Sequence, residues 1–363
     1  MKHIVVIVDG TWVSAADSEN PFSNAYNLNW MLDNKATDGN SQVVFYSSGI
    51  GTDKDIGSYF SGATAEGIDN QVREAYINLC SNYQHSDENN QQDKIYLFGF
   101  SRGAVVARAL SAMVSKFGIL RPAYMDFFPT LWKRFTNPAR YGDRLLAETI
   151  SRQNVSIEIV GLFDCVFGYR GNKGNYYTLR FTEFSVPKNV KYAINILSLD
   201  DSRVAFAPML WDSVSTDEDS ETILEQIWMP GVHSDIGGTY KSNALGRVAL
   251  FSMIDLVIQR TSLGFHGPSI DRMEKSVSDG IEVNIDIFGF WKLMAIKKFS
   301  RKCGSAAGEF IHPIVMEIQK TEMRKYKGRE VIQYLPAAVG AKELIEYEGF
   351  SRKNWRNFIF PHG

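Results

Sequence analysis

The chain has little cysteine, and the spacing of its cysteines excludes two kinds of stabilisation. Cys80, Cys165 and Cys303 are odd in number and far apart in a chain of 363 residues. A disulfide framework needs paired cysteines, and structural metal sites commonly use CxxC spacing, which is absent. We therefore expect reduced thiols in a core, and neither a metal nor another cofactor.

Strong charge of one sign is also missing. Lys and Arg together number 39, and Asp and Glu 41, which gives a formal net charge of −2. Nucleic-acid binding depends mainly on basic side chains that neutralise phosphates. Nucleic acid is therefore not expected as a partner.

Long hydrophobic runs are absent as well. No stretch reaches the roughly 18 to 20 uninterrupted apolar residues that a membrane span requires. The apolar run at 4–8 is too short for the apolar region of a Sec signal peptide. The protein is therefore expected to be cytoplasmic as synthesised. Internal repeats and low-complexity segments are also lacking, which favours a compact enzyme.

Short β-branched and apolar runs, each followed by polar or glycine-rich residues, are present instead. Such runs are typical of strands buried on both faces of a parallel sheet. Helical spacing between them supplies the crossover connections that parallel strands need. The expected strands are 4–8, 42–46, 94–98, 157–163, 192–197 and 223–228, and the expected helices 25–32, 68–79, 104–114 and 247–259. The sequence predicts an α/β fold with a mostly parallel sheet flanked by helices.

Two segments depart from this alternation. Residues 121–150 hold many aromatic side chains among prolines and basic residues and are interpreted as an insertion. The tail beyond the last helix has aromatic residues at 288–291 beside a basic cluster, without a clear strand pattern. We expect a core at 1–262 and a C-terminal appendage at 263–363 packed on it. Both segments either form lid-like covers for an acyl chain or simply pack on the core.

The sequence GFSRG at residues 99–103 matches the G-x-S-x-G pattern of a nucleophile elbow. So short a pattern also occurs by chance, but here a buried strand precedes it and an amphipathic helix follows. In such a turn the serine is exposed, and the next amide lies at a helix N-terminus. The context predicts Ser101 as nucleophile and the backbone N–H of Arg102 as one oxyanion donor.

A nucleophilic serine needs a neutral imidazole, and the hydrolase chain order is serine, acid, histidine. His233 lies in a glycine-rich loop directly after the strand 223–228, where the base belongs. The other five histidines lie at a terminus, in a loop or without a preceding strand: His3, His85, His266, His312 and His362. His233 is the predicted general base.

Two strand ends compete for the acid. Asp164 closes the strand 157–163, while Asp200 and Asp201 close the strand 192–197. Both positions are used in hydrolases, so counting strands leaves Asp164 and Asp200 open. An aspartate at a strand end commonly caps a loop or helix instead, so at least one is expected to be non-catalytic.

The loop after the first strand is the expected source of a second oxyanion donor. Gly10 or Thr11 is positioned to supply that N–H. Asp9 precedes them, and a carboxylate there would repel an oxyanion, so we interpret Asp9 as a loop-organising residue. A metal site made of Asp9, His233 and Asp235 lacks any spacing signature.

Several motifs together resemble the family of α/β-hydrolase domains known as DUF2235, which includes the Tle1 phospholipase effectors of type VI secretion systems. The resemblance covers roughly residues 3 to 260. It is carried by DGTW at 9–12, GIGT at 49–52, REAY at 73–76, LFGFSRGA at 97–104, FDCVFG at 163–168, the segment 205–212 and the segment 228–238. Cys165 replaces a more usual threonine, and Thr239 interrupts a glycine run.

The resemblance implies a triad of Ser101, Asp164 and His233, and it favours Asp164 over Asp200 as the acid. It also implies a serine hydrolase of carboxylic esters, acting as a phospholipase with peripheral membrane contact. Delivery by a type VI secretion system, with an immunity or delivery partner of unknown identity, follows from the same resemblance. The large C-terminal modules of the effectors are not evident here.

Two other functions are compatible with the residues. One is an esterase or lysophospholipase acting on small soluble esters. The other is a non-catalytic hydrolase-fold interaction module, against which the complete set of serine, aspartate and histidine argues.

Overall fold

The structure is a computed structural model. It describes residues 1–10, 21–49, 63–86, 91–137, 148–167, 184–215, 221–241, 243–275, 282–283, 300–319, 322–325, 331–333 and 345–351.

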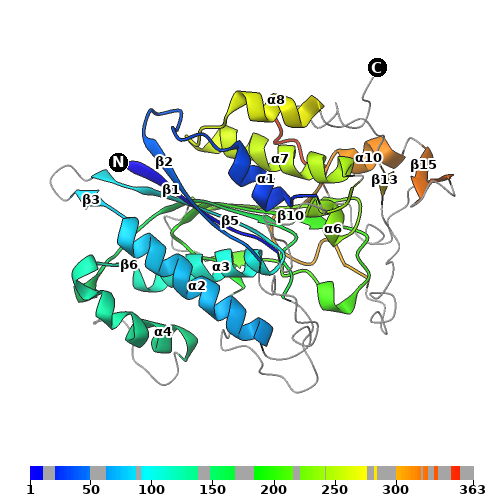
Figure 1. Cartoon of the computed structure of the whole chain (residues 1–363). Helices are drawn as coiled ribbons and strands as arrows, with labels where there is room; N and C mark the ends of the chain where they lie inside the picture. The colour runs from blue at the N-terminus through cyan, green and yellow to red at the C-terminus, as the bar shows by residue number, and fades with distance from the viewer. Residues whose placement is uncertain are drawn as a thin grey trace.

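A seven-stranded sheet forms the centre of the fold (Figure 1), and every pairing within it is parallel. Its order across the sheet is β14-β12-β10-β8-β5-β1-β2. The strands are β1 (Lys2–Val8), β2 (Ser41–Ser47), β5 (Lys94–Phe100), β8 (Ile157–Phe163), β10 (Val190–Ser198), β12 (Ile223–Met229) and β14 (Glu309–Ile311). All six predicted strands lie in this sheet, which confirms the α/β-hydrolase-like fold class.

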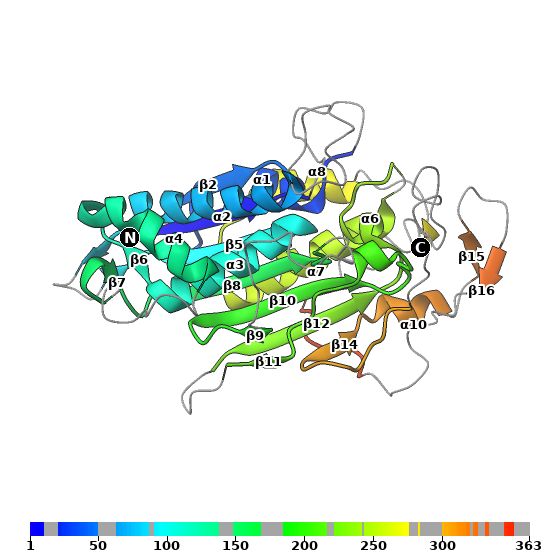
Figure 2. The ribbon, with the colours of Figure 1, turned by 90° about the horizontal axis from the view of Figure 1, so that it is seen from below.

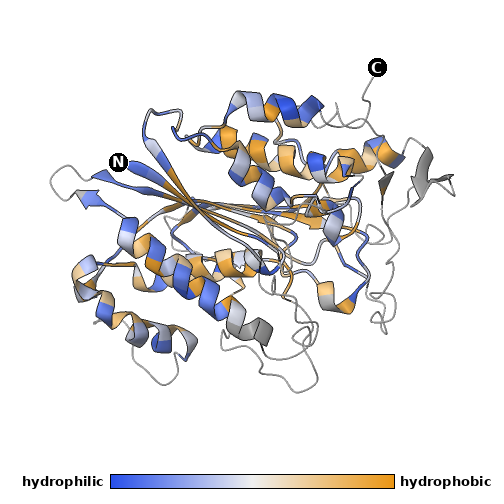
Figure 3. Ribbon diagram, viewed as in Figure 1, coloured by the Kyte–Doolittle hydropathy of each residue, from blue (hydrophilic) through white to orange (hydrophobic). Residues whose placement is uncertain are grey.

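Helices cover both faces of the sheet. The helices α1 (Asn24–Met31), α7 (Ala244–Arg260) and α8 (Gly267–Lys275) lie on one face, and α2 (Ala63–Asn82) and α3 (Arg102–Phe117) on the other, as Figures 1 and 2 show. The short helix α10 (Ile314–Gln319) contributes to the same apolar cluster as α7. The colouring of Figure 3 places hydrophobic residues along the central strands and on the helix faces that meet them.

The sheet is buried on both faces because its strands are apolar on both. In β5, Tyr96 and Phe98 pack in the cluster under α1 and α7, while Ile95 and Leu97 pack in the cluster under α2 and α3. This double burial explains the uninterrupted apolar runs that predicted a parallel sheet.

The described part of the insertion is helical and is closed at its base by two short strands. It contains η2 (Pro122–Phe127) and α4 (Phe128–Thr136), between the antiparallel strands β6 (Ile119–Leu120) and β7 (Ser151–Arg152).

The aromatic side chains of α4 pack against the core. Phe128 lies 5.8 Å from the Tyr76 ring, and Phe135 lies 6.3 Å from the Phe117 ring, measured between centroids. Phe117 ends α3 at the opposite end of that helix from Ser101. The described part of this segment therefore packs on the core, away from the edge that carries Ser101.

The C-terminal segment supplies the edge strand β14, although no strand was predicted there. Three residues pair with β12, from Gln226–Glu309 to Trp228–Ile311. The segment 263–363 was expected to pack on the core as an appendage, but this part of it belongs to the central sheet.

Small sheets lie outside the central one. They are formed by β3 (His85–Ser86) with β4 (Gln91–Gln92), β9 (Ser185–Val186) with β11 (Ser213–Val214), and β13 (Glu282–Val283) with β15 (Glu322–Lys325) and β16 (Val331–Gln333). Within the described residues, no helix is both long and apolar enough to cross a membrane.

Candidate active site

Ser101 occupies a strained turn between β5 and α3. Its backbone φ is 58° and ψ is −122°, a conformation that residues other than glycine rarely adopt. A Cβ at Gly99 would lie 2.4 Å from the carbonyl oxygen of Gly103, and one at Gly103 would lie 2.1 Å from that of Val8. Both glycines of the motif are therefore required by close backbone approach.

His233 begins the short helix α6 (His233–Ile236), which follows β12. Its Nε2 lies 2.9 Å from Ser101 Oγ. The imidazole stacks on the Phe100 ring and meets the Phe206 ring edge-on, each at 4.8 Å between centroids. Packing on two rings fixes the orientation of a buried imidazole toward the serine.

Asp164 follows β8 and lies on the other side of the imidazole. Its Oδ2 is 2.7 Å from His233 Nδ1. The amide of Ser198 donates to Asp164 Oδ1 at 3.0 Å, and the Ser198 hydroxyl donates to Oδ2 at 3.1 Å. The structure thus brings Ser101, His233 and Asp164 into one hydrogen-bonded series.

The two competing aspartates contact backbone amides. Asp200 Oδ2 accepts a hydrogen bond from the amide of Gly231 at 2.7 Å. Asp201 Oδ2 accepts one from the amide of His233 at 3.1 Å, and its carboxylate is also paired with Arg203. Both organise the loop that carries His233, whereas Asp164 bonds the ring itself.

Arg301 is a site residue that the sequence interpretation missed. Its Nη1 donates to Asp164 Oδ1 at 2.6 Å and to Ser198 O at 2.8 Å. Its Nη2 donates to Asp164 Oδ2 at 3.0 Å and to Phe206 O at 2.6 Å. The side chain is buried. The only signal in the sequence was a basic cluster, which is more typical of a solvated surface.

The electrostatics of the buried pair follow from these contacts. Burial alone would raise the pKa of Asp164, but the Arg301 guanidinium and the bond from His233 outweigh it and hold that pKa well below its usual value. Burial lowers the pKa of His233, although Asp164 opposes the shift. A neutral imidazole beside an ionised carboxylate is the state that a general base needs.

The three predicted oxyanion donors differ in their surroundings. Arg102 is the first residue of α3, so its amide lies at a helix N-terminus next to Ser101. The Gly10 amide donates to Asp9 Oδ1 at 2.6 Å. Thr11 lies outside the described residues.

Asp9 organises its loop. Its Oδ2 accepts hydrogen bonds from Ser23 Oγ at 2.5 Å and from the Tyr46 hydroxyl at 2.8 Å, in addition to the bond from Gly10. Burial raises the pKa of Asp9 to about 6 in spite of these three donors. The loop-organising interpretation agrees with this geometry.

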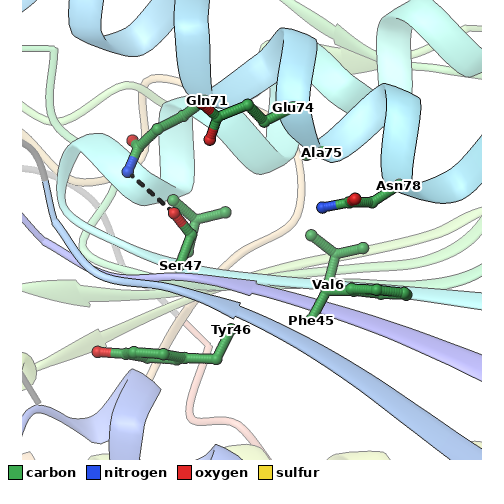
Figure 4. Close-up of a pocket in the computed structure, with 9 residues that line it drawn as sticks. Val6, Phe45, Tyr46, Ser47, Gln71, Glu74, Ala75 and Asn78 are labelled. Atoms are coloured by element: carbon green, nitrogen blue, oxygen red, sulfur yellow. Dashed lines mark hydrogen bonds between the residues drawn. The ribbon is translucent and has the colours of Figure 1, made fainter.

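Other polar clusters are separate from this site. His312 Nε2 lies 2.9 Å from Ser252 Oγ, which forms a second buried serine–histidine pair. The pocket in Figure 4, between β2 and α2, has a volume of about 150 Å³ and holds Gln71, which donates to Ser47 Oγ at 3.3 Å. The described residues contain no group of three or more His, Cys, Asp and Glu side chains placed to hold a metal ion.

The parallel sheet, the strained turn at its carboxyl edge and the histidine beyond β12 define a hydrolase domain of the α/β-hydrolase class. More narrowly, residues 2–256 match a family model, and the chain belongs to that family: "T6SS, Phospholipase effector Tle1-like, catalytic domain".

Individual proteins are similar over parts of their length. An uncharacterised protein of Saccharomyces cerevisiae, YEL023C, is 29% identical over 191 residues, covering 46% of this chain and 26% of the yeast protein. The Tle1 effector, solved bound to the VgrG spike of the type VI secretion system, is 20% identical with a TM-score of 0.42, covering 66% of this chain and 51% of the effector.

An uncharacterised protein from Pseudomonas aeruginosa is 18% identical with a TM-score of 0.48, covering 75% of this chain and 48% of that one. The chain thus spans about a quarter of the yeast protein and about half of each of the two solved chains.

Proposed function

We propose that this chain is a serine-dependent carboxylic ester hydrolase that acts on phospholipids. The observation that carries the proposal is the series Ser101 Oγ, His233 and Asp164 at the strained turn, with separations of 2.9 Å and 2.7 Å. A strained serine within reach of an oriented, neutral imidazole is the arrangement that nucleophilic catalysis requires.

The reaction proceeds by acyl transfer. His233 Nε2 takes the proton of Ser101 Oγ while Oγ forms a bond to the ester carbonyl carbon. The amide of Arg102 donates to the oxyanion that develops. The bond to the leaving alcohol then breaks, and His233 returns the proton to the leaving oxygen. A water molecule, deprotonated by the same imidazole, then attacks the acyl carbon. The bond from that carbon to Oγ breaks, His233 returns the proton to Ser101 Oγ, and the carboxylic acid leaves.

Asp164 and Arg301 hold the imidazole ready for both proton transfers. Asp164 fixes the tautomer with a proton on Nδ1, which leaves Nε2 as the acceptor facing Ser101. We assign Arg301 as a positioning residue, because its two bonds prevent rotation of the Asp164 carboxylate away from the ring.

The second oxyanion donor remains assigned to Gly10 or Thr11. The bond from the Gly10 amide to Asp9 means that this amide can donate to an oxyanion only if it is shared with, or released from, the carboxylate. Protonation of Asp9 would weaken that competing bond.

The phospholipid substrate is supported by the family, whose model describes phospholipase effectors. Delivery by a type VI secretion system, through a contact like that of the Tle1 effector with its VgrG spike, is part of the same proposal. Binding to a lipid surface would then be peripheral.

The test compares the wild type with Ser101→Ala and with Ser252→Ala. Ser252 is a matched control because it is also buried and bonded to a histidine, but it lies within a regular helix. Fatty acid released from phosphatidylethanolamine vesicles and nitrophenol released from short p-nitrophenyl esters are followed separately. Covalent labelling by a fluorophosphonate is measured on all three proteins.

We expect both activities and the labelling to disappear in Ser101→Ala and to persist in Ser252→Ala. Activity confined to short esters would replace the phospholipase proposal by an esterase. Neither activity nor labelling in folded wild-type protein would contradict the hydrolase proposal and favour an interaction module.

A further inference from the structure

A second pocket lies where α1, α7 and α8 meet, on one face of the sheet, where Figure 1 shows the three helices together. Its volume is about 450 Å³. It is lined by two arginines, Arg247 and Arg272, by Asn27, and by apolar and aromatic side chains. None of Ser101, Asp164 and His233 lines it.

Arg247 lines this pocket. Its Nε and Nη1 are buried, and among the described residues neither has a hydrogen-bond partner. Burial lowers the pKa of the Arg247 guanidinium to about 10, and no carboxylate of the described residues opposes this shift. A half-buried guanidinium with two unsatisfied donors is costly, so an anion bound in the pocket beside it would offset part of that cost.

Arg272 adds a second positive charge at the rim. It is exposed on α8, and its guanidinium carbon lies 5.1 Å from the centre of the Trp30 ring. Stacking on an aromatic face holds a guanidinium in place while its N–H groups stay free to bind. The described residues place no carboxylate within ion-pair distance of Arg272 or of Arg247.

The remaining wall residues are mostly apolar or aromatic, and the polar Asn27 donates from Nδ2 to Phe22 O at 3.1 Å. Phe22 and Tyr26 pack together with ring centroids 4.5 Å apart, and Met273 is a buried residue of α8. Phe22 nevertheless leaves 41% of its surface exposed. The pocket thus offers two cationic groups and an apolar surface side by side, which suits an amphiphilic anion rather than a small inorganic ion.

Short contacts connect this pocket to the loops of the candidate active site. Asn24, in the first turn of α1, donates from Nδ2 to Ile236 O at 2.8 Å and to Gly246 O at 2.7 Å. Ile236 ends the helix that begins with His233, and Gly246 precedes Arg247.

We propose that this pocket binds a phosphate group carried on an apolar body. Phosphate is favoured over carboxylate because it offers more acceptor oxygens and more charge to two guanidinium groups. Assigning this phosphate to the lipid substrate rests on the proposed function. Binding itself does not require Ser101.

The experiment measures binding by calorimetry in Ser101→Ala protein, so that no probe is consumed. The probes are hexyl phosphate, inorganic phosphate, hexanoate, hexanol and a short-chain phosphatidylglycerol below its micelle concentration. Each is titrated into the parent, Arg247→Met, Arg247→Lys and Lys275→Met. Lys275 is the control, because it is an exposed cation on the same helix as Arg272 and does not line the pocket.

We expect hexyl phosphate to bind the parent and Lys275→Met equally and to bind Arg247→Met at least tenfold more weakly. Arg247→Lys should be intermediate, and thermal unfolding shows whether each variant is folded. Phosphatidylglycerol binding with the same Arg247 dependence would identify a lipid headgroup as the source.

Inorganic phosphate, hexanoate or hexanol bound as tightly as hexyl phosphate would overturn the proposal, as would equal affinity in folded Arg247→Met. The proposed function is contradicted by a different result, namely the absence of Ser101-dependent ester cleavage in the wild type. That result does not depend on these titrations.

Discussion

Replacing Arg301 by methionine should shift the pH dependence of catalysis as well as its rate. Methionine fills much of the same volume but removes the charge and the two bonds that hold Asp164 at 2.6 Å and 3.0 Å. The acid limb of kcat/KM reports protonation of the base in the free enzyme. Because burial lowers the pKa of His233, we expect that limb below pH 6.5 in the wild type.

The size of the shift follows from the charge that is lost. Arg301 Nη2 and His233 Nδ1 lie 3.0 Å and 2.7 Å from the same oxygen, Asp164 Oδ2, so at most about 6 Å separates them. A unit charge at roughly that distance, at an effective dielectric constant of about 20, contributes on the order of 3 kcal/mol. Arg203 is one cation that lowers the pKa of His233. The Arg301 guanidinium disfavours the imidazolium in the same way, so its removal should raise that pKa. Partial protonation of Asp164 in the variant offsets part of this, which leaves an expected rise of about 1 to 2 pH units.

The plateau rate should fall about 10- to 100-fold. This is less than the roughly 10⁴-fold loss typical when a triad acid is neutralised. Asp164 keeps its two bonds from Ser198, so its carboxylate is loosened rather than removed.

The assay is kcat/KM for a short p-nitrophenyl ester between pH 4.5 and 9. Arg260→Met is the matched control. Like Arg301, Arg260 pairs with a carboxylate of low exposure, that of Glu225. It also donates a hydrogen bond to Tyr347 of the C-terminal segment. Arg301→Lys should restore the acid limb by returning the charge. If Arg301→Met and Arg260→Met had the same pH profile, the role of Arg301 would be structural only.

Three further experiments test the site. Asp164→Asn should lower kcat/KM about 10⁴-fold and Asp200→Asn less than tenfold, and the opposite ranking in steady-state assays would reverse the choice of acid. Gly103→Ala should cost more than about 3 kcal/mol in the free energy of unfolding by urea. Gly267→Ala, where a Cβ meets no atom of the described residues within 4 Å, should stay within about 0.5 kcal/mol. Burial raises the pKa of Asp9 to about 6 in the folded protein, above the value in the unfolded chain. Folding therefore favours the protonated carboxyl group, and the free energy of unfolding falls as the pH rises from 4 to 7. Asp9→Asn should therefore gain roughly 2 to 3 kcal/mol relative to wild type over that range, and a pH-independent difference would refute this.

The sequence was informative where local pattern decides structure. Continuous apolar runs located six strands. The glycines at 99 and 103 indicated a turn where neighbouring backbone segments lie so close that a Cβ would collide with them. His233 could be predicted as the candidate base because a glycine-rich loop after a buried strand has a fixed place at the sheet edge. The acid could not be chosen by pattern alone, since both aspartates end strands and differ only in which atoms their carboxylates reach.

Two features could not be predicted because they depend on long-range contact. β14 has three residues, too few for any periodicity, and its pairing with β12 is set by tertiary packing. Arg301 appears in the sequence within a basic cluster, and its burial follows only from the carboxylate and carbonyl groups that surround it in space. A cationic residue far along the chain from its partner gives no local signal.

These two features together argue that the structural unit holding the candidate site does not end where the family match ends. The match stops at residue 256, yet the pair that holds Asp164 is completed by Arg301, and β12 is covered by β14. A chain cut at 262 would leave the buried Asp164 carboxylate without its guanidinium and expose the edge of β12, and each change is costly in itself. The smallest unit that preserves the site therefore extends at least through β14 at Ile311.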